Sequence, residues 1–318
     1  MIDVYYLKEY GKIWAEYEKA KFKLFEYAAG SKKIIYPLLK RKIDEDFWDV
    51  ISPYGYSGPY SNSDNLNFYQ KFRENFDQYC QENKIVSEFI RFHPLLKNHR
   101  LASKVITVKR RGETVFIDLK NSKEYLWKDL RKGHQGSIKK AQKAEIDIKL
   151  EKGKTIGNFY KLYQQTMWRK KAEKFYLLSD DFFQNSFKQL KNQIFWLGAY
   201  LKNTLIGGAV FLKSDKYIHY YFAATDTNYL NLSPGSLILW EVIKLGKKLG
   251  LEKFHLGGGI DDKLSFYKQG FSPNQSEFYT GEVIHNQEVY DKLCQDKKII
   301  KGDFFPLYRA SINETKNQ

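Results

Sequence analysis

The chain has little cysteine and no long apolar run. Its only cysteines, Cys80 and Cys294, are too few for a disulfide framework and lack the spacing of a zinc site. No stretch approaches the roughly 18 consecutive apolar residues of a membrane-spanning helix. The first residues include Asp3, Lys8 and Glu9, so they do not form a secretory signal. We therefore expect a protein of a reducing cytoplasm.

The common phosphate-binding loops are also missing, although three glycines stand together in HLGGGIDDKLSFYKQGF, residues 255–271. A dinucleotide-binding loop would require glycine where the chain has Asp262, and a P-loop would require Gly-Lys-Ser or Gly-Lys-Thr. Glycine at a strand end permits a tight turn or a close backbone approach. The glycines therefore predict a turn first, with Gly258 as a candidate substrate contact.

What the chain has in excess is positive charge. Lysine and arginine number 53 against 37 aspartates and glutamates, which gives a net charge of +16 and a pI near 9.4. This excess fits an anionic partner such as nucleic acid, a nucleotide-sugar phosphate or an acidic membrane surface. A solvated lysine-rich surface explains it equally well, so charge alone does not choose the partner.

The second half of the chain shows a clear order of elements. Helical spacing over 158–175 and 180–193 precedes two strands around a short turn at 202–204 and a third strand at 217–225. Ser233 and Pro234 then predict a helix start, and 252–256 returns as a strand. A strand, a helix and a strand in this order predict a right-handed parallel crossover. Asp261 or Asp262 caps a short helix, and 276–284 is the last strand.

The first half gives a weaker version of the same plan. A hairpin over 21–43, a helix over 66–83, and strands over 85–93, 104–111 and 114–119 precede one long basic helix, 122–145. Two halves of similar plan indicate an internal duplication. We expect an α/β (α+β) fold with two tandem domains, each a mixed, mostly antiparallel sheet flanked by helices. The expected domains are 1–148 and 149–298, with a tail at 299–318 that packs back on the first domain.

Six motifs occur in an order that is typical of one family: ISPYGYSGP, IRFHPLLKN, SIKKAQKAEIDI, PGSLILWEVI, HLGGG and FYKQGF. With them the chain resembles the Fem-type (FemAB-like) superfamily of tandem-GNAT transferases, which includes the peptidoglycan-bridge aminoacyltransferases. The resemblance extends from about residue 10 to residue 309. It implies transfer of an acyl or aminoacyl group to an amine of a cell-envelope precursor in cell-wall biogenesis, with no metal and no tightly bound cofactor.

The resemblance leaves the acyl donor open between aminoacyl-tRNA and a thioester of coenzyme A or an acyl carrier. Residues 150–195 have room for two ordinary helices but not for the long helical arm of some bridge-forming members, which weakens the case for tRNA. The turn NLSPGS, 231–236, lacks the full glycine pattern of acetyl-CoA-dependent members. The expected partner is an anionic envelope precursor, nucleotide-linked or lipid-linked. tRNA and peripheral contact with the inner membrane face are further candidates.

Lys268 is the first catalytic candidate. On a helix that begins near Asp261, aromatic neighbours such as Phe271 could exclude water around its ammonium group, which would strengthen its attraction for developing negative charge. The resemblance implies the same role, because the essential lysine of the family's FKxxF motif falls on Lys268. An exposed helix lysine is the plain alternative.

Asp118 and Tyr221 are the other catalytic candidates. Asp118 ends the strand TVFIDL, near a carboxylate that the family resemblance associates with a general base, although a strand-end aspartate more often caps the next helix. Tyr220 and Tyr221 lie on opposite faces of their strand by its period of two, so only one can face a cleft. We take Tyr221 as catalytic and Tyr220 as substrate-binding, although one of them belongs to the core.

The remaining candidates would bind substrate. Arg91 and His93 share one face of the expected strand IRFHP and fit a phosphate or carboxylate, although His93 could be a hydrogen-bonded core histidine. Tyr54 and Tyr56 lie in a loop whose composition suits a pocket rim or a packed Ω-loop. Gly235 lies at a helix start whose free backbone amides can hold an anion.

Two other functions are consistent with the sequence. One is an acyl-CoA- or acyl-carrier-dependent N-acyltransferase of a surface amino sugar. The other is a non-catalytic RNA-binding or scaffold protein, which the basic composition permits and the intact FYKQGF motif argues against.

Overall fold

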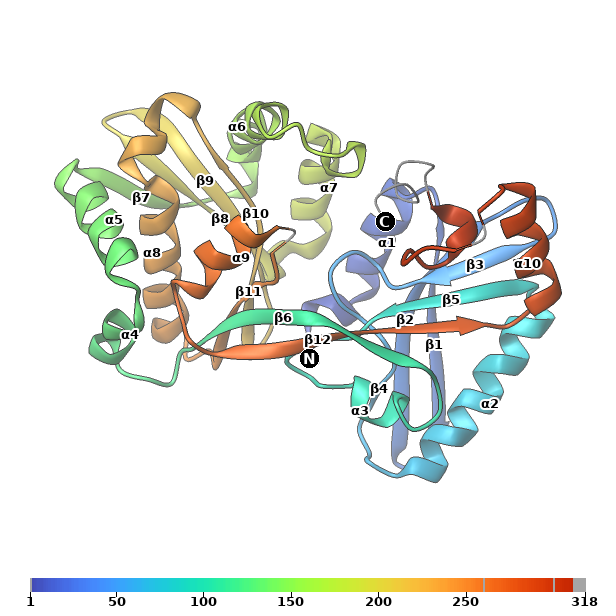
Figure 1. Cartoon of the computed structure of the whole chain (residues 1–318). Helices are drawn as coiled ribbons and strands as arrows, with labels where there is room; N and C mark the ends of the chain where they lie inside the picture. Colours follow the sequence, from blue (N-terminus) through green and yellow to red (C-terminus); the bar gives the residue numbers. More distant parts are fainter. Residues whose placement is uncertain (1, 260, 300, 311–318) are drawn as a thin grey trace. The chain divides into compact units, whose positions relative to one another are not determined.

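The computed structural model describes residues 2–259, 261–299 and 301–310, which form two compact units. We call residues 5–112 together with 277–310 the N-terminal unit, and residues 2–4 together with 113–276 the central unit. Each unit contains a sheet with flanking helices (Figure 1), as the sequence predicted. None of the helices in the described residues is long and apolar enough to cross a membrane.

The division between the units differs from the expected boundary between residues 148 and 149. Residues 113–148 belong to the central unit, because the second half of β6 (Val108–Asp118) pairs with β11 (Lys253–Gly257). Residues 277–298 belong to the N-terminal unit, because β12 (Gln275–Ile284) pairs there with β5 (Ile85–Arg91). Pairing between strands far apart in sequence therefore decides the boundary.

The N-terminal unit has the strand order β1-β2-β3-β5-β12-β6. β1 pairs antiparallel with β2, which confirms the predicted hairpin, and β3 pairs parallel with β5. Helix α2 lies beside this sheet (Figure 1), and its side chains Phe72 and Phe76 are buried in a largely aromatic core. Its elements outside β5, β6 and β12 are η1 (Val4–Tyr6, which starts at the unit boundary), α1 (Lys8–Tyr17), β1 (Lys21–Ala29), β2 (Lys32–Lys42), β3 (Trp48–Ile51), β4 (Tyr60–Ser61), α2 (Leu66–Glu82), α3 (His99–Ala102), α10 (Gln287–Asp296) and η6 (Leu307–Arg309).

The described part of the C-terminal tail contacts this unit. The Arg309 Nε atom donates to Asp49 Oδ2 at 2.9 Å, and the Tyr308 hydroxyl lies 2.7 Å from the Ser87 hydroxyl. The predicted strands 104–111 and 114–119 merge into the single strand β6, which begins only at Val108, so residues 104–107 lie outside it. Its one glycine, Gly112, has a φ of +139°, a conformation that favours glycine, and the strand continues through it.

The central unit has the strand order β6-β11-β10-β9-β8-β7. The β8–β9 hairpin and the parallel pairing of β10 with β11 across α8 confirm the predicted order. Its elements are α4 (Lys123–Asp129), α5 (Lys132–Lys143), β7 (Ile146–Glu151), η2 (Gly153–Thr155), α6 (Ile156–Arg169), η3 (Lys174–Tyr176), α7 (Asp180–Leu190), η4 (Lys191–Gln193), β8 (Ile194–Leu201), β9 (Thr204–Lys213), β10 (Tyr217–Thr225), η5 (Thr227–Leu232), α8 (Pro234–Lys248), β11 and α9 (Asp262–Gln269).

The sequence predicted one long basic helix over 122–145. This prediction is wrong in one respect, because the segment forms two helices, α4 and α5. Leu130 stands at the break with an extended backbone, ψ 131°, and its side chain is buried in the core. The Gln135 side chain donates to the backbone carbonyls of Trp127 and Leu130, which satisfies acceptors at the end of α4. The break lets both helices direct apolar side chains into the same core.

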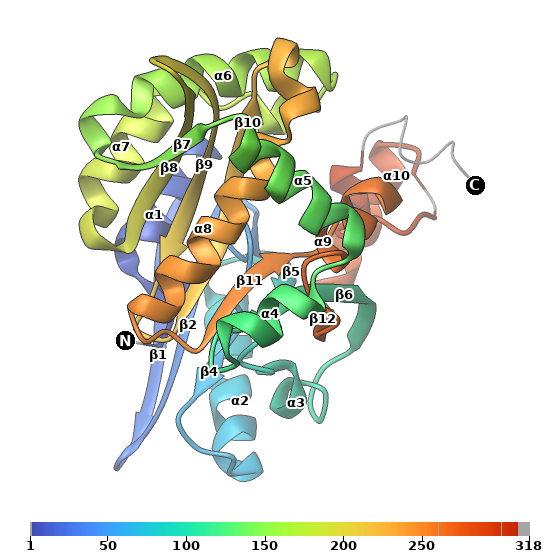
Figure 2. The same cartoon turned by 90° about the vertical axis from the view of Figure 1, so that its left-hand side faces the viewer.

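Helices α6 and α8 cover opposite faces of the central sheet. A Cβ at Gly207 would lie 3.2 Å from Pro234 of α8, whereas one at the next residue, Gly208, would lie 2.9 Å from Phe159 of α6. Successive residues of a strand point to opposite faces, so the two helices lie on different sides. Figure 2 shows α8 in front of strands β8 and β9.

Candidate functional site

The central feature of the site is the point where β10 and β11 part. The two strands pair in parallel only as far as His219 and His255, although β10 continues to Thr225 and β11 to Gly257. β10 has a bulge at Tyr221 in its pairing with β9. We call residues 220–225 and 256–257 the strand fork. Backbone groups on its facing edges do not pair with each other in the described structure, so the β10–β11 ladder ends at the histidine pair.

Lys268 reaches the strand fork from α9. Asp261 caps this helix by accepting a hydrogen bond from the Leu264 amide at 2.7 Å, as predicted. The Lys268 side chain is buried, its Nζ atom donates to the Gly258 carbonyl at 2.5 Å, and the same atom lies 5.8 Å from the centre of the Tyr220 ring. The chain therefore holds a buried cation at the end of β11.

The glycine run allows this approach. A Cβ at Gly259 would lie 2.5 Å from the Ser265 amide nitrogen, a backbone atom that cannot move aside. Gly257 has a φ of +74°, in the left-handed region that favours glycine. The predicted tight turn is thus present, and its Gly258 carbonyl accepts the hydrogen bond from Lys268.

The environment of Lys268 lowers the pKa of its side chain. Burial lowers its pKa, and the nearby charge of Lys170 lowers it further, to about 8. Lys268 is therefore mostly cationic at neutral pH, and it gives up its proton more readily than an exposed lysine does. A buried amine with such a pKa is typical of functional sites.

Replacing Lys170 by alanine should raise the pKa of Lys268, because it removes the neighbouring positive charge. If the cationic form is the active one, the alkaline limb of the pH–rate profile should move up by roughly half a pH unit. Lys174, an exposed lysine of the same connection between α6 and α7, provides the matched control, and Lys174→Ala should leave the limb in place. An unchanged limb in both variants would show that Lys170 does not act on the site.

The first turn of α8 faces α9. The Tyr267 hydroxyl lies 3.4 Å from the Ser236 hydroxyl, and a Cβ at Gly235 would lie 3.8 Å from that Tyr267 oxygen. Burial raises the pKa of Tyr267 to about 12, although the Ser236 hydrogen bond opposes it, so Tyr267 remains a proton donor at neutral pH. The prediction that the Ser233 side chain caps α8 is wrong. Ser233 has a left-handed backbone, φ 55°, and makes no capping hydrogen bond. Pro234 begins the helix as predicted.

The two tyrosines of β10 differ in their surroundings. Tyr220 packs against the core cluster beneath α8 and faces Lys268. Tyr221 is the bulged residue, and its ring lies 4.1 Å from that of Phe222. The bulge interrupts the strict alternation that the sequence predicted. Both residues lie at the strand fork.

Asp118 and Phe271 are not brought to the strand fork. Asp118 pairs with Lys253, the first residue of β11, so it lies at the other end of that strand, and its side chain accepts from the Lys120 amide. The cap of the next helix is Ser122. Phe271 is 1% exposed in the core, beside the ring of His134 at 4.3 Å. Neither residue is positioned to contact a substrate at the fork.

The other predicted binding residues belong to the N-terminal unit. Tyr54 stacks on Trp14 at 4.5 Å, and the Tyr56 ring lies 5.8 Å from that of His93, so the loop is packed. β5 ends at Arg91, which leaves His93 outside the strand and removes the predicted shared face. The Arg91 Nη2 atom donates to the Ser52 carbonyl, whereas its Nε is buried and has no hydrogen-bond partner in the described residues. The Arg91 Nε donor is therefore buried and does not face solvent.

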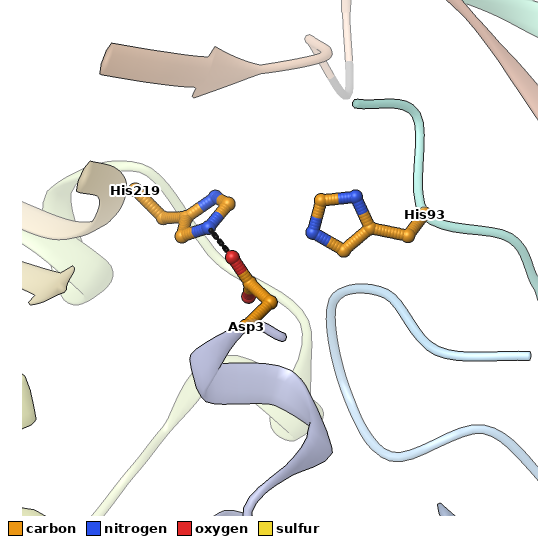
Figure 3. A group of neighbouring side chains, drawn as sticks. All are labelled: Asp3, His93 and His219. Carbon is orange, nitrogen blue, oxygen red and sulfur yellow. Dashed lines mark hydrogen bonds and ion pairs between the residues drawn. The ribbon is translucent and has the colours of Figure 1, made fainter. Parts of the chain in front are cut away.

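A buried triad went unpredicted from the sequence. Asp3 Oδ2 lies 2.9 Å from His219 Nε2, and His219 Nδ1 lies 3.3 Å from His255 Nδ1 (Figure 3 shows the first contact). All three residues are at most 1% exposed. The two histidines form the last pair between β10 and β11 before the strand fork. Asp3 and His219 are 216 positions apart, so no local pattern connects them.

Comparison with known proteins agrees with this architecture. The sequence profile of the acetyltransferase (GNAT) domain family matches residues 128–269, which include α8, the strand fork and α9. No curated protein matched the chain in a sequence comparison. FemX has a similar solved structure, with a TM-score of 0.72 and 11% identity over 91% of this chain and 94% of FemX.

Two further solved structures are similar at TM-scores above 0.5. A conserved protein of unknown function from Bacteroides thetaiotaomicron has a TM-score of 0.59 and 10% identity, over 89% of this chain and 95% of that one. L-PGS from Bacillus licheniformis has a TM-score of 0.57 and 11% identity, over 93% of this chain and 97% of that one. At these identities the likeness concerns the fold, and it confirms the predicted fold class. The chain has the Fem-like tandem GNAT fold of FemX, with an acetyltransferase (GNAT) domain match in its central unit.

Proposed function

We propose that the protein is an acyltransferase that moves an acyl or aminoacyl group from an activated ester or thioester to an amine and forms an amide. The observation that carries the proposal is the buried Lys268 at the strand fork. Attack of an amine on the acyl carbon places negative charge on the carbonyl oxygen. A buried cation stabilises that charge strongly, because little water competes with it.

The leaving group and the donor's anionic part have candidate partners beside the fork. Tyr267 is protonated at neutral pH and reaches the first turn of α8, where it can give a proton to a departing oxygen or sulfur. The free amides at the start of α8 can hold a phosphate or carboxylate of the donor. Aminoacyl-tRNA and acyl-CoA or acyl-carrier thioesters all carry phosphate.

We propose an amine of a cell-envelope precursor as acceptor, either a peptidoglycan peptide or a nucleotide- or lipid-linked sugar. The net charge of +16 suits such an anionic molecule. The connection between α6 and α7 adds a local basic surface, because Lys170, Lys171 and Lys174 are exposed there beside Trp168, which is 76% exposed. The same surface could meet tRNA or an anionic membrane face.

The thioester donor and a non-catalytic role remain the competing proposals. α6 and α7 are two ordinary helices without a long arm, which favours a thioester over tRNA. A scaffold that only binds RNA has no use for a buried lysine, whose desolvation destabilises the fold. No carboxylate among the described residues forms an ion pair with Lys268, so only its hydrogen bond to the Gly258 carbonyl offsets that penalty in part.

A transfer assay separates these proposals. Purified protein is incubated with labelled aminoacyl-tRNA or with an acyl-CoA and acyl-carrier panel, together with muramyl-peptide and amino-sugar acceptors. We expect label in an amide product. Transfer that ribonuclease abolishes identifies tRNA as the donor, and transfer that ribonuclease leaves intact identifies the thioester. RNA binding without transfer from any donor would overturn the proposed enzyme and support the scaffold.

A further inference from the structure

The connection between α6 and α7, residues 168–177, exposes two large apolar side chains. Trp168 is 76% exposed, the highest value among the large apolar residues that the structure describes, and Leu177 is 48% exposed. Three lysines are exposed between them: Lys170, Lys171 and Lys174. Single exposed apolar side chains are ordinary on protein surfaces, but here a tryptophan and a leucine flank a basic segment. A partner for this surface would offer both negative charge and an apolar layer.

The fold holds both ends of the connection in place. The Arg169 Nη1 atom donates to the Thr225 carbonyl at 3.0 Å and to the Thr227 hydroxyl at 2.7 Å. The hydroxyl of the buried Tyr163 donates to the Tyr176 carbonyl at 2.8 Å. Trp168 and Leu177 are therefore neighbours of anchored residues, and the connection has a defined place on the central unit (Figure 1).

The chemistry of the surface fits an anionic lipid bilayer. Tryptophan is enriched at the boundary between bilayer and water, where its ring meets both headgroups and acyl chains. Lysines beside such an apolar anchor attract anionic headgroups. The connection carries four basic residues and one acidic residue, Glu173, so its net charge has the required sign.

RNA would use this surface only in part. Single-stranded RNA stacks its bases on aromatic rings and places its phosphates near basic side chains, which would engage Trp168 and the lysines. Leu177 would stay exposed to water, because an aliphatic side chain offers no stacking face. A bilayer covers both apolar residues at once. Leu177 therefore favours the bilayer over RNA.

The connection adjoins the strand fork. Thr225, the last residue of the fork on β10, donates its amide to Thr166 Oγ1 at 3.2 Å and accepts from Arg169. Lys170 lies close enough to Lys268 for its charge to lower the pKa of that lysine. A molecule that is anchored in a bilayer beneath the connection would therefore present its headgroup beside the fork.

We propose that residues 168–177 dock the protein on an anionic bilayer, with Trp168 and Leu177 in the boundary between headgroups and acyl chains. Docking itself does not depend on catalysis. Its use rests on the proposed acyl transfer, because it selects among the acceptors proposed above. The acceptor is then lipid-linked and anchored in the bilayer on which the protein docks.

Vesicle sedimentation with the full chain tests docking. Vesicles of equal parts phosphatidylglycerol and phosphatidylcholine should carry the protein into the pellet, and vesicles of phosphatidylcholine alone should bind it at least about ten-fold more weakly. Trp168→Ser should reduce the affinity for the anionic vesicles by about ten-fold or more, since it removes the largest apolar group from the boundary. Tyr125→Ser, at a 52% exposed aromatic residue of α4, is the matched control and should bind as the wild type does.

A charge variant separates this surface from the net charge of the protein. Glutamine in place of all three lysines of the connection should weaken binding to the anionic vesicles about 100-fold. A matched triple variant removes the same charge from exposed positions of α5: Lys132→Gln, Lys140→Gln and Lys143→Gln. It should weaken binding by less than about ten-fold, because salt screens charges that do not touch the bilayer. Equal losses in the two variants would overturn the assignment of the surface.

A fluorescent label reports directly on position 168. Both native cysteines, Cys80 and Cys294, are buried, so Trp168→Cys offers one accessible thiol for an environment-sensitive fluorophore. Its emission should shift to shorter wavelength on anionic vesicles, because the label enters a less polar layer. The same label on Tyr125→Cys should not shift. A label at 168 that stays in water while the protein enters the pellet would overturn the proposal.

The outcomes distinguish docking from the proposed function. If the wild type transfers an acyl group but binds neither kind of vesicle, docking is overturned and acyl transfer stands. If docking behaves as expected and no donor and acceptor pair reacts, docking stands and acyl transfer falls. RNA that binds through the three lysines while vesicles do not bind also overturns docking. Transfer to a lipid-linked acceptor in anionic vesicles should fall in Trp168→Ser by the factor that binding loses, and an unchanged rate would overturn the choice of acceptor.

Discussion

Lys268→Met should reduce kcat by about 100- to 1,000-fold, the cost of losing one donor to a developing oxyanion. Methionine keeps the length and apolar stem of the lysine, but it presents no charge to the strand fork and no hydrogen bond to Gly258. Measuring kcat and KM separately on the donor identified by the transfer assay tests this. A variant with wild-type kcat would remove Lys268 from the mechanism.

The stability of the Lys268→Met variant provides an internal control. Burial lowers the pKa of Lys268 from 10.5 to about 8. The charged lysine therefore lowers the free energy of unfolding increasingly as the pH falls from 10.5 toward 8. Below about pH 8 this destabilisation is complete. At pH 7 methionine removes a penalty of up to about 3 kcal/mol, and the variant should melt no lower than the wild type. Lys263→Met, on the exposed side of α9, should change neither activity nor melting temperature.

Arg73→Met should destabilise the N-terminal unit by about 3–5 kcal/mol at pH 7, the largest stability effect that we expect. Arg73 Nη1 lies 2.7 Å from Glu88 Oε2, and the Glu88 side chain is fully buried. The variant leaves that carboxylate with the Tyr36 hydroxyl and His285 as its partners. Urea unfolding at pH 7 measures the effect.

The loss should depend on pH in a defined direction. Burial by itself raises the pKa of Glu88, but Arg73 and His285 outweigh it and bring the pKa from 4.5 to about 2. The stability that the pair contributes is therefore complete above pH 4.5 and is lost as the pH falls toward 2, where the two proteins should converge. Lys33→Met, which breaks an exposed pair with Glu26, should cost at most about 1 kcal/mol. If Arg73→Met also lost only about 1 kcal/mol of unfolding free energy, the stabilising role of the buried Arg73–Glu88 pair would be contradicted.

Local patterns were sufficient for the elements that surround Lys268. The turn between β8 and β9, the Pro234 helix start and the Asp261 cap follow from residues within a few positions of each other. Such features depend on neighbouring residues, so a single sequence is enough to predict them. The family motif then identified Lys268 as the residue that α9 presents.

Contacts between distant residues required the tertiary structure. The helix breaks at Leu130 because α4, α5 and α8 bury apolar side chains in the same core. The boundary between the units depends on the pairing of β6 with β11 and of β12 with β5. Asp118 of β6 pairs with Lys253, at the end of β11 far from the strand fork. The sequence could not predict this, because strand register is not a local property.

The site itself shows the same division. The sequence by itself determined the order of strands and helices, the glycine turn and the candidate Lys268. Only the tertiary structure decided that β10 and β11 part after His219 and His255, and that Asp3 lies against His219 from 216 positions away. Hydrophobic periodicity records which side of an element is buried, but it carries no information about which distant side chain is buried against it.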